Sequence, residues 1–248
     1  MIQTLKRTFK YWTASEETDE SGFARGLCFY KLFWIFLLGC VLGVVVVETL
    51  WCYWTRSCIE SRSGVLYGPF NPVYGFGAVA LTLGLQRISK KGPLWIFLGS
   101  MLLGGSVEYL CSLVQEVSFG TLSWEYSGTF MNLNGRTNLM FAFFWGALGL
   151  LWIQVFYPLL SRGVERIPKK TGIRLTWILV IFMIVNMAVS GLAVARWSER
   201  TRGVPASNTA AVLIDQKYPD GLMKRVYPNM TFPAGFQEDA SAENTLSR

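Results

Sequence analysis

The stretch YGPFNPVYGFG, residues 67–77, decides how the rest of the chain is interpreted, because it stands where a hydrophobic segment begins. Its two prolines fix the backbone φ angle and remove two donors, whereas its three glycines permit backbone that other residues cannot follow. These backbone-shaping residues are Gly68, Pro69, Pro72, Gly75 and Gly77. Backbone polar groups in hydrocarbon must be paired within the protein. We therefore expect a shaped loop or a broken helix entry that packs on its neighbours.

The composition around this stretch is typical of a membrane protein. Of the 248 residues, 52% are hydrophobic, and the apolar residues collect in long blocks. The net charge of +7 comes from 23 lysines and arginines against 16 acidic residues. These basic residues cluster in short connections between apolar blocks, so they indicate membrane topology rather than a nucleic-acid partner.

Five apolar blocks predict an all-α, polytopic fold with five transmembrane helices. The blocks are residues 32–51, 73–85, 94–114, 139–160 and 175–195. The second block is short for a span of roughly 20 residues. It must borrow length from the Gly/Pro stretch before it, which should therefore lie at membrane depth.

The basic residues predict an N-in, C-out orientation in the cell membrane. Thirteen lysines and arginines lie in the N-terminal segment and the second and fourth connections, against three in the first and third. Arg196, Arg200 and Arg202 follow the last predicted span on the predicted outer side, so these three argue against the orientation. Residues 1–31 are then a cytoplasmic segment, either an interfacial helix or a basic tail. Residues 32–196 form the membrane domain, and residues 197–248 form an outer tail that we expect to be disordered from about residue 237.

The predicted outer side carries the long connections, and part of the tail should be ordered there. Asn208 is suited to cap one short helix, and a second helix could start at Pro219. Leu222, Met223 and the residues one turn later would then share an apolar face. We expect this small segment to dock on the outer mouth, because it cannot bury a core alone.

Two carboxylates lie within predicted spans, Glu48 and Glu108, and burying either is costly unless it faces protein or water. Ser100, Gly104 and Ser112 share one helical face with Glu108. This stripe suits close packing around a polar pocket, or a simple bond from Glu108 to a neighbouring helix. For Glu48 the alternative is a side chain that reaches the headgroups.

The third connection, WEYSGTFMNLNGRTNL (residues 124–139), is dense in hydrogen-bonding groups. Arg136 is its single basic residue and the natural partner of an outer carboxylate, either Glu108 or, in reserve, Glu48. We expect Glu108, Arg136 and the Gly/Pro loop to converge on one outward-facing polar site. The alternative is a self-satisfied turn with Arg136 on lipid phosphates. The further pocket candidates are Tyr67, Asn71, Tyr74, Trp124, Glu125, Tyr126, Asn132, Asn134 and Asn138, with Gly135 shaping the turn.

Several kinds of chemistry lack their residues in this sequence. Histidine is absent, which excludes Ser-His and Cys-His nucleophile pairs and the HExxH metalloprotease signature, and no Walker A loop is present. The five cysteines offer no zinc set, so we expect no metal and no cofactor. Cys52 and Cys58 either form a disulfide outside the first span or stay isolated thiols.

The two motifs together resemble a family of bacterial membrane proteins described as ABC-transporter permeases of the CmpB type. In that family a GPF-P-YG-G motif and a W-[DE]-Y-S…N-x-N-G-R motif each precede a span. The matching residues are Gly68, Pro69, Phe70, Pro72, Tyr74, Gly75, Gly77, Trp124, Glu125, Tyr126, Ser127, Asn132, Asn134, Gly135 and Arg136. The family commonly has Asp after the Trp, and Glu125 keeps that charge. The resemblance covers residues 32–232 and implies an ATPase partner, for which the connection 161–174 or the N-terminal segment offers a docking site.

We prefer a transport component, a membrane subunit with an outward polar pocket that works with an ATPase or with other membrane subunits and that could form an oligomer. A second hypothesis is an enzyme at the outer leaflet, which would use Glu48, Glu108 or Glu125 as acid and base on a lipid or cell-wall precursor. A third is a membrane scaffold for an envelope complex.

Overall fold

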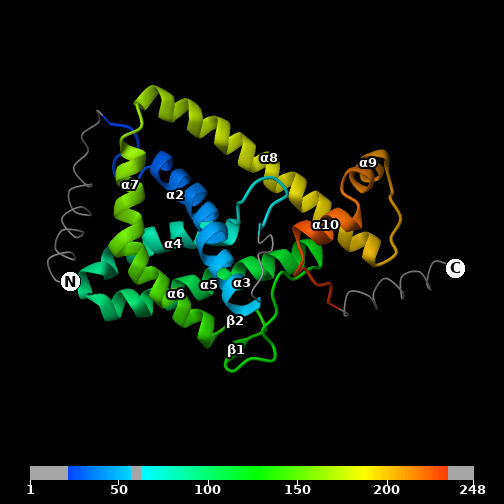
Figure 1. Ribbon diagram of the computed structural model, residues 1–248, viewed down its shortest axis with the longest axis horizontal. Coiled ribbons are helices and arrows are strands. Elements are labelled where there is room, and N and C mark those ends of the chain that lie inside the picture. The colour runs from blue at the N-terminus through cyan, green and yellow to red at the C-terminus, as the bar shows by residue number, and fades with distance from the viewer. Residues whose placement is uncertain (1–21, 57–62, 234–248) are drawn as a thin grey trace.

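The computed structural model describes residues 22–56 and 63–233, which form a predominantly helical molecule (Figure 1). The helices in chain order are α2 (Phe29–Leu42), η1 (Gly43–Glu48), α3 (Thr49–Arg56), α4 (Pro72–Ile88), η2 (Ser89–Lys91), α5 (Pro93–Phe119), α6 (Leu139–Leu151), η3 (Trp152–Phe156), α7 (Tyr157–Glu165), α8 (Lys169–Thr201), α9 (Thr209–Lys217) and α10 (Asp220–Val226). Here η1 and η3 are π-helical and η2 is a 3₁₀ turn. Two short antiparallel strands, β1 (Asn132–Leu133) and β2 (Thr137–Asn138), were not expected from the sequence.

Four continuous helices in the described residues are long and apolar enough to cross a membrane. They are Phe29–Trp54, Pro93–Phe119, Leu139–Glu165 and Lys169–Thr201. Each contains or closely overlaps one predicted block, so the helical class is confirmed and four of the blocks are candidate membrane spans. The remaining block lies in α4, whose 17 residues extend about 25 Å at about 1.5 Å per residue. The count of five spans, and the orientation, remain predictions.

Helix α4 is packed between α2 and α5, and glycine brings the backbones together. A Cβ added at Gly75 would lie 2.7 Å from a ring carbon of Phe36 in α2. One at Gly77 would lie 2.6 Å from the ring of Trp145 in α6. The buried core at this junction includes Leu81 and Leu85 of α4. Gly75 and Gly77 therefore serve close packing of helices. Both lie in regular α-helix, and of the three glycines in this stretch only Gly68 adopts the unusual backbone that the sequence predicted.

One predicted topology signal has a different role in the structure. Lys31 is only 1% exposed, and its ammonium donates hydrogen bonds to Ser161 and Glu165 of α7. This basic residue therefore joins α2 to α7. The expectations for residues 1–21 and 237–248 fall outside the described residues. So does Cys58, and its pairing with the buried Cys52 is not tested.

Candidate functional site

The Gly/Pro stretch begins as a loop that reaches the middle of two long helices. The amide of Asn71 donates to the carbonyl of Cys40, 3.2 Å away, near the midpoint of the helix Phe29–Trp54. The Phe70 ring lies 6.0 Å from that of Phe182, at the centre of α8. Figure 1 shows this segment, in cyan, between α2 and α8. Residues 63–71, called the inserted loop below, thus lie beside the middle of both long helices. That they lie at membrane depth, as the short second block predicts, remains a prediction.

Side chains of α8 satisfy the inserted loop's backbone. The amide of Tyr67 donates to Asn186 Oδ1 at 3.2 Å, and Asn186 Nδ2 donates to the Tyr67 carbonyl at 2.7 Å. The amide of Leu66 donates to Ser190 Oγ at 2.9 Å. Both side chains are buried, Asn186 with 1% exposed. These contacts meet the requirement that irregular backbone at membrane depth be paired within the protein.

The rest of the inserted loop is closed by its own residues. Ser63 Oγ donates to the carbonyls of Gly68 and Phe70, at 2.6 and 3.1 Å. Gly68 has φ of +80°, which a residue with a side chain rarely adopts. Asn71 then caps α4, because its Oδ1 accepts from the Val73 amide at 3.1 Å. The loop therefore ends in a preformed helix start.

The connection from α5 to α6 is a hairpin closed by internal bonds. Asn132 Nδ2 donates to the carbonyls of Ser127 and Thr129, and Asn132 Oδ1 accepts from the Gly135 amide. Gly135 has φ of +67°. Asn138 caps α6 through an acceptor bond from the Phe141 amide at 2.8 Å. This self-satisfied turn matches the structural alternative that the sequence left open.

Glu125 and Trp124 also belong to this internal network. Glu125 Oε1 accepts from the Ser127 amide at 2.7 Å, and hydrogen bonds from Ser127 lower the pKa of the exposed carboxyl. Trp124 Nε1 donates to the Arg136 carbonyl at 2.9 Å. Both candidates shape the hairpin.

Glu108 is buried at the base of the hairpin and is 7% exposed. Its two oxygens accept from the Tyr126 hydroxyl at 3.2 Å and the Thr137 hydroxyl at 2.8 Å. The Tyr126 ring stacks on Phe141, with centroids 4.7 Å apart. The other members of the predicted stripe on α5, Ser100, Gly104 and Ser112, are buried as well. Carboxylate and hydroxyls together can exchange hydrogen bonds with a polar ligand.

Arg136 does not form the ion pair that the sequence predicted. Its guanidinium pairs with Glu116, which lies two turns beyond Glu108 in α5, and it stacks 5.4 Å from the Tyr109 ring. Asn134 Nδ2 donates to the same Tyr109 at 3.1 Å. Glu116 was missed, although its place in the last turn of α5 brings it nearest the connection. The side chain of Glu48, the reserve partner, is not among those described.

The tail docks as the sequence predicted. Asn208 caps α9, and α10 follows Pro219. Met223 and Tyr227 pack with Trp197 of α8, Phe119 of α5 and Leu66 of the inserted loop; the other apolar residues of this cluster are Ala193, Val194, Tyr218, Val189, Ile214, Leu222, Val226, Met230 and Phe232. The Tyr67 and Tyr218 hydroxyls lie 2.7 Å apart. Burial is the main cause that raises the Tyr218 pKa to about 12, and it does the same for Tyr227.

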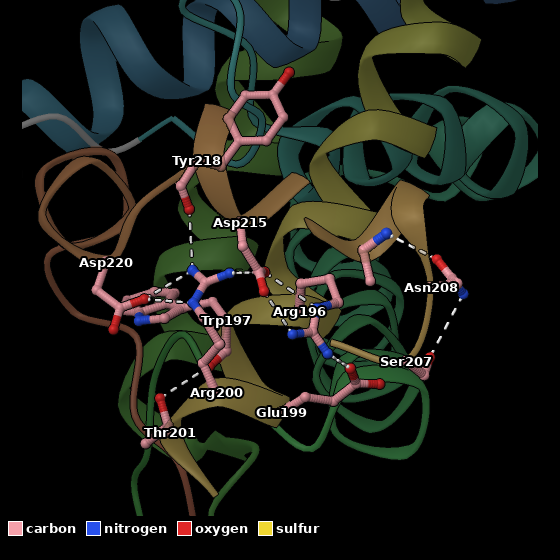
Figure 2. Close-up of polar contacts among 11 residues, drawn as sticks. Arg196, Trp197, Glu199, Arg200, Thr201, Ser207, Asn208, Asp215, Tyr218 and Asp220 are labelled. Atoms are coloured by element: carbon pink, nitrogen blue, oxygen red, sulfur yellow. Dashed lines mark hydrogen bonds and ion pairs between the residues drawn. The ribbon is translucent and has the colours of Figure 1, made fainter. Parts of the chain in front are cut away.

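Charged residues fix α9 and α10 to the end of α8 (Figure 2). Arg196 binds both oxygens of Asp215, at 3.1 and 2.7 Å, and pairs with Glu199. Arg200 pairs with Asp215 and with Asp220. Hydrogen bonds from Arg196 are the main cause that lowers the pKa of Asp215. In the sequence, both arginines argue against the predicted orientation. Their spacing of four residues places them on one helical face, where they bind the tail instead.

The tail joins the two groups of candidates. It contacts the inserted loop through Tyr67 and Leu66, and it contacts the start of the hairpin connection, where Leu122 and Thr231 exchange backbone hydrogen bonds of 3.0 and 2.8 Å. Tyr74, by contrast, faces Trp145 in an apolar groove between α2, α4 and α6. The hydrogen bonds of Glu108 and those of the inserted loop thus lie in two separate places, and the tail contacts the inserted loop and the start of the hairpin connection.

Comparison with known proteins gives one family. A family model named ABC_trans_CmpB and described as "Putative ABC-transporter type IV" matches residues 34–191, which is more than half of the chain. No curated protein and no solved structure matches.

Proposed function

Because this chain belongs to the family described as putative ABC-transporter type IV, we propose that it is the permease-like membrane subunit of a transport system in the cell membrane. It acts there with an ATPase or with other membrane subunits. Its own residues supply the membrane path and the substrate contacts, and the partner supplies the energy.

The observation that carries this proposal is the inserted loop followed by α4. The loop starts α4 beside Cys40, near the middle of the helix Phe29–Trp54, which supports a broken crossing beside the four candidate spans. Irregular backbone at membrane depth occurs where it is buried in protein or lines a cavity, and broken helices commonly form the substrate sites of transporters. A purely structural span would have no need of this arrangement.

With five crossings and a cytoplasmic N-terminus, the hairpin and the docked tail face outward. The buried Glu108 and its hydroxyl partners Tyr126 and Thr137 then form an outward-facing polar site on the C-terminal half of α5. The Arg136–Glu116 pair lies beside that site and fixes the hairpin over it. We propose that the substrate makes its polar contacts there.

The same orientation places the connection from α7 to α8 in the cytoplasm, where the partner ATPase would bind. Arg166 in that connection and Lys170 in the first turn of α8 are exposed. They are suited to pair with acidic groups of a docking partner.

Co-purification in a mild detergent tests this proposal. The full chain should bring down a subunit that binds a photoreactive ATP analogue. The variant Arg166→Glu with Lys170→Glu should lose that subunit, while the control Lys224→Glu with Arg225→Glu, exposed on α10, should keep it. A pull-down without an ATP-binding protein, or equal retention by both variants, would contradict the proposed role.

A further inference from the structure

An apolar groove lies along α4, with α2 and η1 forming one wall and α6 and η3 forming the other. Its walls include Leu42, Val46, Val47, Leu81, Leu148 and Phe156, and none of its lining residues is charged. The groove is open on one side and shallow, with a cavity volume of about 40 Å³. The lining Trp152 donates its Nε1 hydrogen bond to Thr82, 2.9 Å away, so its polar atom is already satisfied.

Both π-helical segments of the described chain line this groove. In η1 the Thr49 amide and hydroxyl both bond to the Val44 carbonyl, five residues back. In η3 the Tyr157 amide bonds to the Trp152 carbonyl, and Pro158, which has no amide hydrogen, follows at once. π-helical turns are rare and occur frequently at functional sites. Because two π-helical segments line facing walls of one groove, we interpret the groove as a functional feature.

The groove opens onto the apolar outer surface of two membrane-spanning helices. Val45 and Leu50 in the first of these helices, and Leu151 and Val155 in the second, are exposed and lie close in the chain to residues that line the groove. The groove is therefore continuous with the surface that faces the lipid chains. Water would find no polar partner in it, and an empty groove would leave its walls without packing contacts.

We propose that the groove binds one acyl chain of a membrane lipid, which enters sideways from the bilayer. In hydrocarbon the hydrophobic effect gives no preference for the groove over the surrounding lipid, so close packing against the valine, leucine and aromatic walls supplies the selectivity. The site holds whether or not the protein transports a substrate.

Photo-crosslinking tests the site on the full chain in bilayers. The probe is a phosphatidylcholine with a diazirine in one acyl chain. Adducts in the wild type should concentrate on Val46, Val47, Leu148 and Phe156 relative to Val45 and Leu151, which face lipid outside the groove. An even distribution of adducts over the lining residues and these residues outside the groove would overturn the proposal.

Filling the groove gives an independent test from each wall. Val47→Trp and Leu148→Trp should each lose most of the adducts at the remaining lining residues. Their matched controls Val45→Trp and Leu151→Trp, of the same residue type and on the same helices, should keep them. Equal adduct levels in filled and control variants would overturn the proposal. Should either filled variant fail to fold, the wild-type adduct map and the variant on the opposite wall still decide the question.

Discussion

At the scale of single residues, Asn186 determines whether the inserted loop can stay at membrane depth. Its amide group satisfies both backbone groups of Tyr67, a task that a neighbouring strand performs in a sheet. An aliphatic residue at this position would leave the partly buried amide and carbonyl of Tyr67 unpaired. The cost of such a loss is about 1–3 kcal/mol for each unsatisfied group.

We predict that Asn186→Ala destabilises the protein by about 2 kcal/mol and lowers its thermal unfolding midpoint in detergent. Val185→Ala, at the exposed neighbouring position of α8, serves as the control and should change the midpoint little. Equal midpoints for the two variants would show that the loop does not depend on Asn186.

A double-mutant cycle on Arg136 and Glu116 tests the corrected ion pair. Arg136→Gln and Glu116→Gln should each lower the unfolding midpoint, and the double variant should lose less than the sum, with a coupling of about 1 kcal/mol. The same cycle with Glu108→Gln should give a smaller coupling, because Glu108 binds Tyr126 and Thr137 instead. A larger coupling with Glu108 would restore the original expectation.

These residues show what could and could not be predicted from the sequence. Pro72 and a block too short to span predicted where the inserted loop lies, because backbone chemistry acts locally. Charge partners were harder to predict, because a helix offers Glu108 and Glu116 on similar faces and the hairpin's fold chooses between them. The π-helical segments could not be predicted from the sequence, because the residue patterns that predict an α-helix do not reveal where a turn contains one extra residue.

At the scale of elements, the docked tail combines apolar packing with buried and half-buried titratable groups. Asp215 has a lowered pKa in the folded state, so the stability it contributes is present above its unfolded pKa of about 3.9 and is lost as the pH falls below that value. Tyr218 and Tyr227 have raised pKa values of about 12. Their contribution is complete below about pH 10 and is lost as the pH rises toward 12.

We therefore predict that the tail stays docked between about pH 5 and pH 9 and loosens at both extremes. Spin labels on Val212→Cys in α9 and Val117→Cys in α5, both exposed, would report their separation as a function of pH in a background without native cysteines. Asp215→Asn should remove the acid transition, and Tyr218→Phe with Tyr227→Phe should weaken the alkaline one. Transitions that survive both changes would assign the pH dependence to other groups.

At the scale of the whole molecule, the hairpin connection and the tail gather at one end of the bundle, and the inserted loop reaches from there toward its middle. Leu122 of the hairpin connection pairs with Thr231 of the tail, and Leu66 of the inserted loop packs on the same tail. The opposite end carries Lys31 with Ser161 and Glu165 of α7. The molecule therefore has one elaborate end and one simpler end. We place the elaborate end on the outer side of the membrane.

Labelling of single cysteines in intact cells with a membrane-impermeant maleimide tests that placement most directly. In a variant whose native cysteines are replaced by alanine, Gly128→Cys in the hairpin and Ser207→Cys before α9 occupy exposed positions at the elaborate end, and Gly163→Cys is exposed in α7. The account predicts that Gly128→Cys and Ser207→Cys are labelled at once, and that Gly163→Cys is labelled only after the cells are permeabilised. Labelling of Gly163→Cys in intact cells, with protection of the other two, would contradict it.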